Sequence, residues 1–520
     1  MAATIFAGIG YNVLANGHLH EDAYILFVYA EEFARSGRIS YNPGGPPTEG
    51  ATDFLWMVAL AGFYALGIPS GIAALMLNTL GVGLIAWLIT SGLRTHRAPV
   101  WLIAALALAL PFVWFVQSGY GGFSAPFFAS IALLIAVLLI EQRGLLWVPL
   151  LSLLLALLRP DGVILGVGFT VIGLAFCPAH RRRRYLILCA AAVLGGALYF
   201  LWRWRYFGAF LPLPLLVKSA GDRTLLGLEK TLDYLSTHGW LLIAGLAGGL
   251  IAHQRPRRIA IVALPFIALL VFLCFGLQTQ NIAFRFQAPL TAFAVYCAAI
   301  GLAVAYRTAS PGLPRAALLG AVAGFLAIND ARYFRFEMRA LLDGNYSHFF
   351  PIALAPSISD RAVVAVTEAG RMAYWLPGTT VDLVGLNTAE TAVNPPDAAF
   401  LARLEPDMIL LHHGGVVRLT CGDENPPFCA LSQEELALAY RQAGGRSGER
   451  VRQAQFAILD HLLERVTDYQ LILVRNGWLY DHVYAVKRGG LIDQRDVASA
   501  LEKSFSPEGK VSYLQATAAR

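Results

Sequence analysis

The stretch His20-Glu21-Asp22-Ala23-Tyr24-Ile25 places two adjacent carboxylates between hydrophobic segments of a chain that is otherwise poor in charge. Two further motifs follow it, Tyr41-Asn42-Pro43-Gly44-Gly45 and Thr48-Glu49-Gly50-Ala51-Thr52-Asp53-Phe54-Leu55-Trp56. Acidic groups held at a membrane face are costly unless they serve a site. The decisive question for every other segment is therefore whether it shares a membrane face with Glu21 and Asp22.

The composition predicts a polytopic membrane protein. Hydrophobic residues make up 57% of the 520 residues and charged residues 14%, with a mean hydropathy of +0.57, whereas soluble domains carry about 25% charged residues. The net charge of +6 could indicate nucleic-acid binding. Most arginines before residue 340, however, fall in short loops between apolar segments, a pattern that orients membrane proteins. We therefore expect a lipid bilayer and no nucleic acid as partner.

About eleven spans are predicted, the first within residues 1–19. That segment is short for a span, which needs about 20 residues, and it lacks the basic start of a signal peptide. Residues 53–67 are also too short and are expected to form an interfacial or half-inserted helix. The other predicted spans are 72–93, 99–116, 123–140, 144–158, 161–177, 185–202, 239–252, 259–277, 287–306 and 314–330.

Threading these spans alternately segregates the loops by charge. One side receives Arg94, Arg97, Arg143, Arg181–Arg184, Arg255, Arg257, Arg258, Arg307 and Arg315, and is cytoplasmic by the positive-inside rule. The opposite side receives the acidic loop 20–56 and the segments 117–122, 159–162, 202–238 and 278–286. We expect a protein of the bacterial inner (plasma) membrane whose acidic loop is periplasmic.

Residues 331–520 differ in texture from residues 1–330, which form the predicted transmembrane catalytic domain. Short apolar runs at 363–366, 408–411, 471–474 and 479–486 have strand length, and polar helix-forming stretches such as 432–442 and 454–465 separate them. This predicts a soluble α/β domain outside the cytoplasm, where Cys421 and Cys429 could form a disulfide. The last dozen residues are expected to be frayed.

The acidic side carries a mixture of carboxylates and cations. Such a set suits sugar transfer from a lipid phosphate, because a carboxylate can act as general base on an acceptor hydroxyl while Arg and Lys hold the leaving phosphate. The alternative is a set of unrelated interfacial charges that anchor helix ends. Lys218 is the first lysine in the chain, and it either reaches the interface as an anchor or binds a phosphate as a compact cation.

The motifs resemble a GT-C glycosyltransferase group that includes the AftB-type arabinofuranosyltransferases. The resemblance covers most of the chain in the right order, and the matching motifs are Asp22-Ala23-Tyr24-Ile25, Phe27-Val28-Tyr29-Ala30, Tyr41-Asn42-Pro43-Gly44, Glu49-Gly50-Ala51-Thr52, Leu55-Trp56, Arg159-Pro160-Asp161-Gly162, Tyr206-Phe207-Gly208, Leu211-Pro212, Lys218, Arg285-Phe286, Thr367-Glu368-Ala369-Gly370 and Val381–Asn387. The chain departs from the group's pattern at Glu21, usually Asp, and at Thr279-Gln280-Asn281, where a carboxylate is lost.

The resemblance implies a GT-C fold and inverting transfer of a sugar, arabinofuranose as the best guess, from a polyprenyl-phosphate donor to a glycan or protein acceptor. Asp22 would be the catalytic base and Glu21 would orient the acceptor or assist it. Four cations would bind the donor phosphate or support the site: Arg159, Arg205, Lys218 and Arg285. The expected substrate-binding residues are Tyr24, Tyr41, Asn42, Glu49 and Asp53. The sequence identifies no cofactor with certainty, and a divalent cation could bind at the acidic loop.

Two other functions fit parts of the sequence. A transporter or flippase of lipid-linked sugars would also have many spans, but transporters tend to show repeats and interrupted helices near the membrane centre. A non-catalytic glycan-binding protein with a membrane anchor would need only one span. The sequence also lacks a Gly-x-Gly-x-x-Gly nucleotide-binding pattern beside a strand and helix, which favours a lipid-linked donor.

Overall fold

The computed structural model describes the chain apart from residues 104–105, 107–117, 220–225, 253–255, 277, 279–280, 310–311, 313–337, 340, 343–344, 414–418, 420, 422–425, 443–449 and 476–480. The predicted span 314–330 and most of 99–116 lie outside the described residues, as does the predicted domain boundary near residue 330. The span count of eleven therefore stays a prediction.

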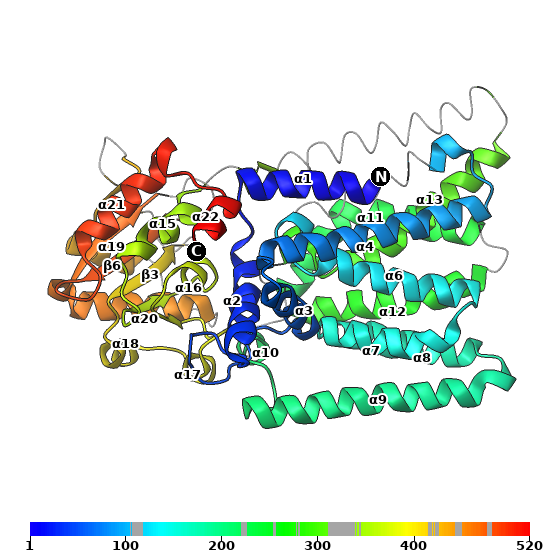
Figure 1. The fold of residues 1–520 in the computed structure, drawn as a ribbon, viewed down its shortest axis with the longest axis horizontal. Coiled ribbons are helices and arrows are strands. Elements are labelled where there is room, and N and C mark those ends of the chain that lie inside the picture. The colour runs from blue at the N-terminus through cyan, green and yellow to red at the C-terminus, as the bar shows by residue number, and fades with distance from the viewer. Residues whose placement is uncertain are drawn as a thin grey trace.

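Apolar helices form a bundle in which most members run in one direction or its reverse (Figure 1). They are α1 (Ala2–Asn16), α4 (Ser70–Thr95), α6 (Ala125–Glu141), α7 (Val148–Leu158), α8 (Gly162–Phe176), α9 (Ala179–Phe207), α11 (Leu226–Ala252), α12 (Pro256–Phe275) and α13 (Ala288–Thr308). Five of the described helices, α4, α9, α11, α12 and α13, are long and apolar enough to cross a membrane. Only 6% of the most apolar part of α9 is buried, so α9 lies at the edge of the bundle.

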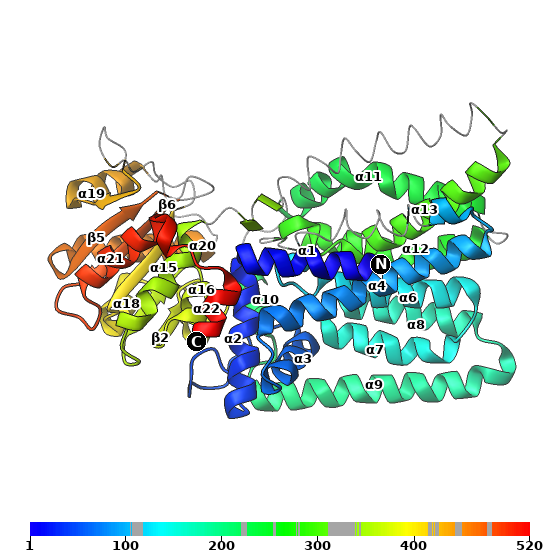
Figure 2. The same ribbon diagram turned by 45° about the horizontal axis from the view of Figure 1, so that its top comes forward.

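Two helices of the first loop are not part of this alignment. Helix α2 (Glu21–Ser36) runs across the end of the bundle, between the bundle and the C-terminal domain, in both views (Figures 1 and 2). It ends at Gly37, whose φ of +72° turns the chain away, and such a left-handed C-cap suits glycine. Helix α3 (Phe54–Ala65) lies in the segment where an interfacial helix was expected.

The segment 202–238 differs from the predicted loop. Helix α9 continues to Phe207, a short helix α10 spans Leu213–Ser219, and α11 begins at Leu226. The sequence did not predict these helical segments, because the hydrophobic pattern used to find spans is interrupted by Arg203, Arg205, Glu229 and Lys230.

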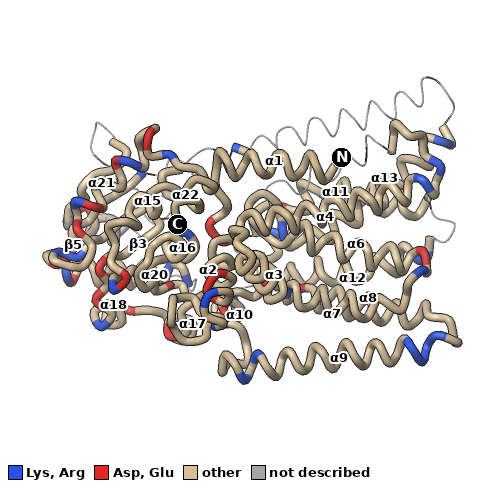
Figure 3. Tube along the Cα trace, in the orientation of Figure 1, with Lys and Arg blue, Asp and Glu red and all other residues tan. Residues whose placement is uncertain are grey.

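Basic residues gather at the end of the bundle that lies away from the C-terminal domain (Figure 3). They follow α4, α6 and α13 or open α9 and α12, and include Arg94, Arg97, Arg143, Arg181–Arg184, Arg257, Arg258 and Arg307. The acidic pair Glu21–Asp22 lies at the opposite end, where α2 begins. The segregation expected from the sequence is therefore present among the described residues.

The C-terminal part contains a six-stranded mixed sheet in the order β2-β1-β3-β6-β5-β4. Strands β1 (Val363–Val366), β3 (Met408–His413), β5 (Tyr469–Val474) and β6 (Asp481–Lys487) coincide with predicted apolar runs. Strands β2 (Thr379–Asp382) and β4 (Phe428–Ala430) were not predicted, because they are short and not uniformly apolar. Strands β2, β1 and β3 are parallel, whereas β6, β5 and β4 are joined by antiparallel pairing.

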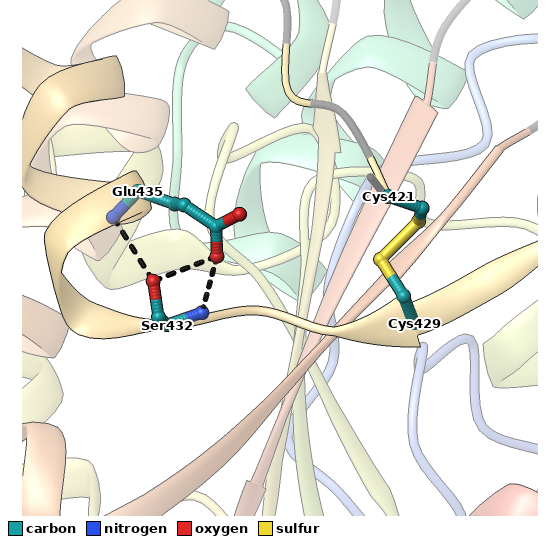
Figure 4. The surroundings of a disulfide bond; sticks show 4 residues. All are labelled: Cys421, Cys429, Ser432 and Glu435. Carbon is teal, nitrogen blue, oxygen red and sulfur yellow. Dashed lines mark hydrogen bonds between the residues drawn. A yellow bond between two sulfur atoms is a disulfide. The ribbon is translucent and has the colours of Figure 1, made fainter. Parts of the chain in front are cut away.

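Helices surround this sheet. They are α15 (Tyr346–Leu354), α16 (Arg371–Trp375), α17 (Ala389–Val393), α18 (Ala398–Leu404), α19 (Gln433–Gln442), α20 (Arg450–Glu464), α21 (Gln494–Phe505) and α22 (Tyr513–Ala519). Cys421 and Cys429 form a disulfide, as predicted, and the nearby Ser432 and Glu435 exchange the hydrogen bonds of a capping box at the start of α19 (Figure 4).

The expectation of a frayed C-terminus is wrong. Helix α22 opens with a capping box made by Ser512 and Gln515. The fully buried Tyr513 accepts a hydrogen bond from the backbone N–H of Gly71 at 2.9 Å, and the guanidinium of Arg520 lies 3.3 Å from the carboxylate of Glu31. These contacts fix the end of the chain against α2 and α4.

Candidate functional site

A cavity of about 600 Å³ lies where the bundle meets the C-terminal domain. Three carboxylates and three cations line it: Asp22, Asp53, Asp161, Arg159, Lys218 and Arg285. Most of the remaining lining is apolar and comes from α2, α8, α10, α12 and the loop that contains Leu386. The cavity therefore has a charged part, formed by these six side chains and called its floor below, and an apolar part, called its wall.

Asp22 and Arg285 form the first ion pair of the cavity. Asp22 lies in the first turn of α2, and its carboxylate is 3.3 Å from a guanidinium nitrogen of Arg285. The Arg285 guanidinium carbon also lies 3.9 Å from the centre of the Phe123 ring, a cation–π contact. The buried Nε of Arg285 has no hydrogen-bond partner among the described residues. Arg285 thus keeps an unused donor beside the carboxylate.

An amide network holds the turn that presents Arg285. The side chain of Asn281 donates to Gln278 at 2.7 Å and to Gln287 at 2.9 Å, and its oxygen accepts from the backbone N–H of Phe286 at 3.1 Å. Such side-chain to backbone bonds stabilise irregular turns. Amide side chains therefore hold this turn.

Arg159 is neutralised by two carboxylates. It donates to both oxygens of Asp161, at 3.0 and 3.2 Å, and lies 3.6 Å from Asp53. Asp53 also accepts from the hydroxyl of Ser124 at 2.6 Å. Because all these groups are largely buried, the cluster is a fixed element that links α3, α6 and the turn before α8.

Lys218 is a cavity cation for which the described residues supply no partner. Within the described part of the chain, no hydrogen bond or ion pair joins its ammonium group to another residue. Burial, together with the nearby charge of Arg285, lowers the pKa of Lys218 to about 8, while Asp22 opposes the shift. Even a half-buried ammonium is costly to leave without an anion, so this position favours an anionic ligand.

The hydrophobic wall of the cavity continues to the outside of the protein. Leu215, Phe272 and Phe275 line the cavity, yet they are 46%, 50% and 72% exposed. Exposed apolar side chains on a membrane-facing surface are compatible with lipid contact. A ligand with a hydrocarbon tail could therefore have its polar head at the charged floor.

Glu21 does not line the cavity. Its carboxylate accepts hydrogen bonds from the backbone N–H groups of Gly370 at 2.6 Å and Arg371 at 3.0 Å, and lies 3.3 Å from the Arg371 side chain. Successive helical residues point about 100° apart, which explains how Asp22 can face the cavity while Glu21 faces the C-terminal domain. Burial raises the pKa of Glu21 to about 7.

Three predicted substrate-binding residues lie instead at the contact with the C-terminal domain. Tyr24 is fully buried, with its ring 5.1 Å from that of Tyr374. The Tyr41 hydroxyl donates to the carbonyl of Ala369, and the Asn42 amide exchanges two hydrogen bonds with the backbone of Thr380, at 2.9 and 2.8 Å. These residues belong to the packing that surrounds the site and do not line the cavity.

Two further predicted site residues also lie outside the cavity lining. The Glu49 carboxylate accepts hydrogen bonds from Nε and Nη2 of the buried Arg203 side chain and does not line the cavity, so it tethers α9 to the first loop. Arg205 is exposed on the last turn of α9 and is not among the cavity residues. The distinction was invisible in sequence, because Arg203 and Arg205 lie two positions apart and only the helix geometry separates them.

The structure also adds cavity residues that sequence reasoning did not assign. Phe123 supports Arg285 and Leu386 reaches the cavity from the C-terminal domain. Within the described residues, His, Cys, Asp and Glu form no group of three or more that could hold a metal ion. The acidic side chains of the cavity have guanidinium groups as their cationic neighbours.

The fold is similar to that of ArnT from Cupriavidus metallidurans. The structure of ArnT bound to undecaprenyl phosphate gives a TM-score of 0.53 and 13% sequence identity, covering 92% of this chain and 97% of that one. The apo structure from the same organism gives 0.54 and 14% with the same coverage. At this identity the likeness shows the fold alone, and it supports the predicted GT-C fold class; the AftB-type relationship stays a prediction.

Sequence comparison adds little about activity. Residues 345–479 match a family described as a domain of unknown function (DUF8728). No curated protein matches the sequence.

Proposed function

We propose that this protein is a GT-C glycosyltransferase that moves a sugar from a polyprenyl-phosphate donor to a hydroxyl of an envelope glycan, glycolipid or protein. The observation that carries the proposal is one cavity in which Asp22, an unpaired Lys218 and a partly unpaired Arg285 meet an apolar wall that opens to the outside. The likeness to ArnT, whose structure was solved with undecaprenyl phosphate, supports a lipid-linked donor.

In the proposed reaction Asp22 is the general base. The acceptor oxygen attacks the anomeric carbon as its proton passes to the Asp22 carboxylate. The bond between the anomeric carbon and the phosphate oxygen breaks, its electron pair leaves with polyprenyl phosphate, and the configuration inverts. The guanidinium of Arg285, 3.3 Å away, holds the Asp22 carboxylate in place at the cavity.

Lys218 and Arg285 stabilise the leaving phosphate. Lys218 supplies a charge with no described counter-ion, and Arg285 supplies its unused Nε donor. Preorganised donors aimed at developing charge are the strongest general contribution to such catalysis. Arg159, already neutralised by Asp53 and Asp161, shapes the floor, while Glu21 and Arg205 take no part in phosphate binding in this scheme.

The orientation and the substrates follow from the same scheme. The basic end of the bundle is cytoplasmic, so the cavity and the domain of residues 331–520 face the periplasm of a bacterial inner membrane. The Cys421–Cys429 disulfide supports that compartment. Arabinofuranose remains the preferred sugar because of the motif resemblance, and a divalent cation at the acidic loop stays a prediction.

The test uses purified full-length protein in lipid nanodiscs and a panel of synthetic polyprenyl-phosphate sugars that includes arabinofuranose. Release of polyprenyl phosphate is measured for the wild type, for Asp22→Asn, and for Glu21→Gln as a matched control at the neighbouring carboxylate. We expect release from one donor that Asp22→Asn abolishes and Glu21→Gln preserves. Full activity of Asp22→Asn would rule out Asp22 as the base. The same protein reconstituted in vesicles is tested for movement of the donor between leaflets, and such movement without release would favour the transporter.

A further inference from the structure

The helix that carries Lys218 is built from two opposite faces. Pro214, Leu215 and Lys218 line the cavity, whereas Leu213, Leu216 and Val217 pack away from it in a separate apolar cluster. At about 100° per residue, these two sets lie on opposite sides of α10. The position of the Lys218 ammonium therefore depends on what holds the second face.

The second face of α10 is held by the C-terminal domain. Leu213 and Val217 are buried in a cluster with Val384 and Ala392, and Leu386 packs against the same cluster. Val384 and Leu386 lie in the loop after β2, and Ala392 lies in α17. This apolar cluster is distinct from the main cores of the bundle and of the sheet.

The supporting segment is itself tightly fixed. The fully buried Asp382 carboxylate accepts hydrogen bonds from the backbone N–H groups of Val384 at 2.9 Å and Asn387 at 2.9 Å. Arg450 donates to the carbonyl of Ala392 at 3.1 Å, at the end of α17. These bonds make the loop and α17 a preorganised surface and not a mobile flap.

Gly385 allows the loop to lie directly on α17. Its φ is +92°, and an added Cβ would come within 2.7 Å of the backbone of Ala392. Only glycine fits such a close approach at this backbone conformation. The support of α10 depends on the contact between the loop and α17, and that contact requires glycine at position 385.

We propose that the C-terminal domain is a structural part of the donor site: Val384 and Ala392 are positioning residues that set the place of Lys218, and Leu386 closes the cavity wall. This inference rests on the proposed function, because it assigns a donor phosphate to Lys218. It gives residues 382–392 of the otherwise unassigned domain a definite role. Truncating the Val384 side chain, which does not line the cavity, loosens α10 and thereby weakens phosphate binding.

The experiment is a double-mutant cycle on full-length protein in nanodiscs, with undecaprenyl phosphate as the probe. Dissociation constants are measured for the wild type, Val384→Ala, Lys218→Ala and the double variant. Lys218→Ala should weaken binding about tenfold or more, as expected for a lost charge-assisted contact. Val384→Ala should weaken it about threefold or more and should add nothing once Lys218 is absent, because the two changes act on one contact.

Controls separate positioning from general destabilisation. Leu401→Ala truncates a fully buried residue in the other core of the same domain and should leave the dissociation constant unchanged. Val384→Ile should restore binding, whereas Gly385→Ala should weaken it like Val384→Ala. Additive effects of Val384→Ala and Lys218→Ala, or equal weakening by Leu401→Ala, would overturn the positioning role. Unchanged binding by Lys218→Ala would instead overturn the proposed phosphate site itself.

Discussion

The Asp22 carboxylate and the Arg285 guanidinium lie 3.3 Å apart at the floor of the cavity, and Arg285 stacks at the same time on Phe123. Arg285 therefore has a planar partner and a charged partner, and a lysine could satisfy only the second. In the proposed reaction Arg285 holds Asp22 through Nη2 and donates to the leaving phosphate through Nε. We therefore expect Arg285 to tolerate substitution least among the cations of the site.

Arg285→Lys should reduce turnover about 100-fold, the usual size of the effect when one stabilising donor is lost. The lysine retains charge but loses the fork and the ring contact. Polyprenyl phosphate release under saturating donor is the measurement, with Arg205→Lys, an exposed neighbour on α9, as the matched control that should keep full activity. An active Arg285→Lys enzyme would contradict the role of the guanidinium.

Lys218 should give donor binding an alkaline limit. Its pKa is lowered to about 8 by burial, so the ammonium is charged below that pH and loses its charge above it. Undecaprenyl phosphate binding should therefore weaken as the pH rises from about 7 to about 9.5, and Lys218→Arg should remove this limb because Arg stays charged. The dissociation constant is measured at a series of pH values for both proteins. An identical loss of affinity at alkaline pH in the wild type and in Lys218→Arg would assign the pH dependence to another group.

Glu21→Gln should stabilise the protein increasingly as the pH rises. Burial raises the pKa of Glu21 from 4.5 to about 7, despite the opposing charge of Arg371, and Glu368 adds to the rise. A raised folded-state pKa gives stability that is complete below about 4.5 and is lost as the pH rises through about 7. Glutamine can still accept from Gly370 and Arg371 but cannot ionise. The melting temperatures of both proteins at several pH values should diverge upward; a constant difference would refute this.

Glu49→Gln should destabilise the protein by about 3 kcal/mol, because it leaves the buried Arg203 without its counter-charge. The two side chains are only 9% and 5% exposed. Thermal unfolding in nanodiscs is the measurement, and Glu390→Gln, which breaks an exposed pair with Arg403, is the control that should change little. Loss of activity in fully folded Glu49→Gln would restore the original prediction that Glu49 contacts substrate.

The cysteines offer a test of compartment. Cys421 and Cys429 are eight positions apart and form a disulfide, which in bacteria is maintained outside the cytoplasm. In intact cells both thiols should resist maleimide labelling until a reductant is added. Free thiols in untreated cells would place the domain on the cytoplasmic side and reverse the proposed orientation.

The sequence was sufficient for features that repeat along the chain or combine charge with hydrophobicity. The apolar helices, the segregation of arginines, four strands and the pairing of Cys421 with Cys429 could all be predicted. Asp22, Asp53, Arg159, Lys218 and Arg285 were predicted as site residues and do line one cavity. Their catalytic and binding roles stay predictions.

The predicted residues that lie outside the cavity share one physical cause. The direction in which a side chain points cannot be read from its position in the sequence. Glu21 and Asp22 diverge because one helical step separates them. Arg203 is buried and paired with Glu49, whereas Arg205 is exposed, because the two residues lie on different faces of α9. Tyr24 and Tyr41 were assigned to substrate from the motif resemblance, but contacts with a segment distant in the sequence bury them.

The side chain of Asn42 has a consequence for the surface of the sheet. Strand β2 lies at one edge of the sheet, and the outward-facing N–H and C=O of Thr380 would otherwise remain open to pairing. The Asn42 amide occupies both groups in the place where a seventh strand would start. Exposed sheet edges invite pairing with other chains and aggregation. The first loop thus blocks that edge, and a variant such as Asn42→Ala would leave the sheet open to self-association.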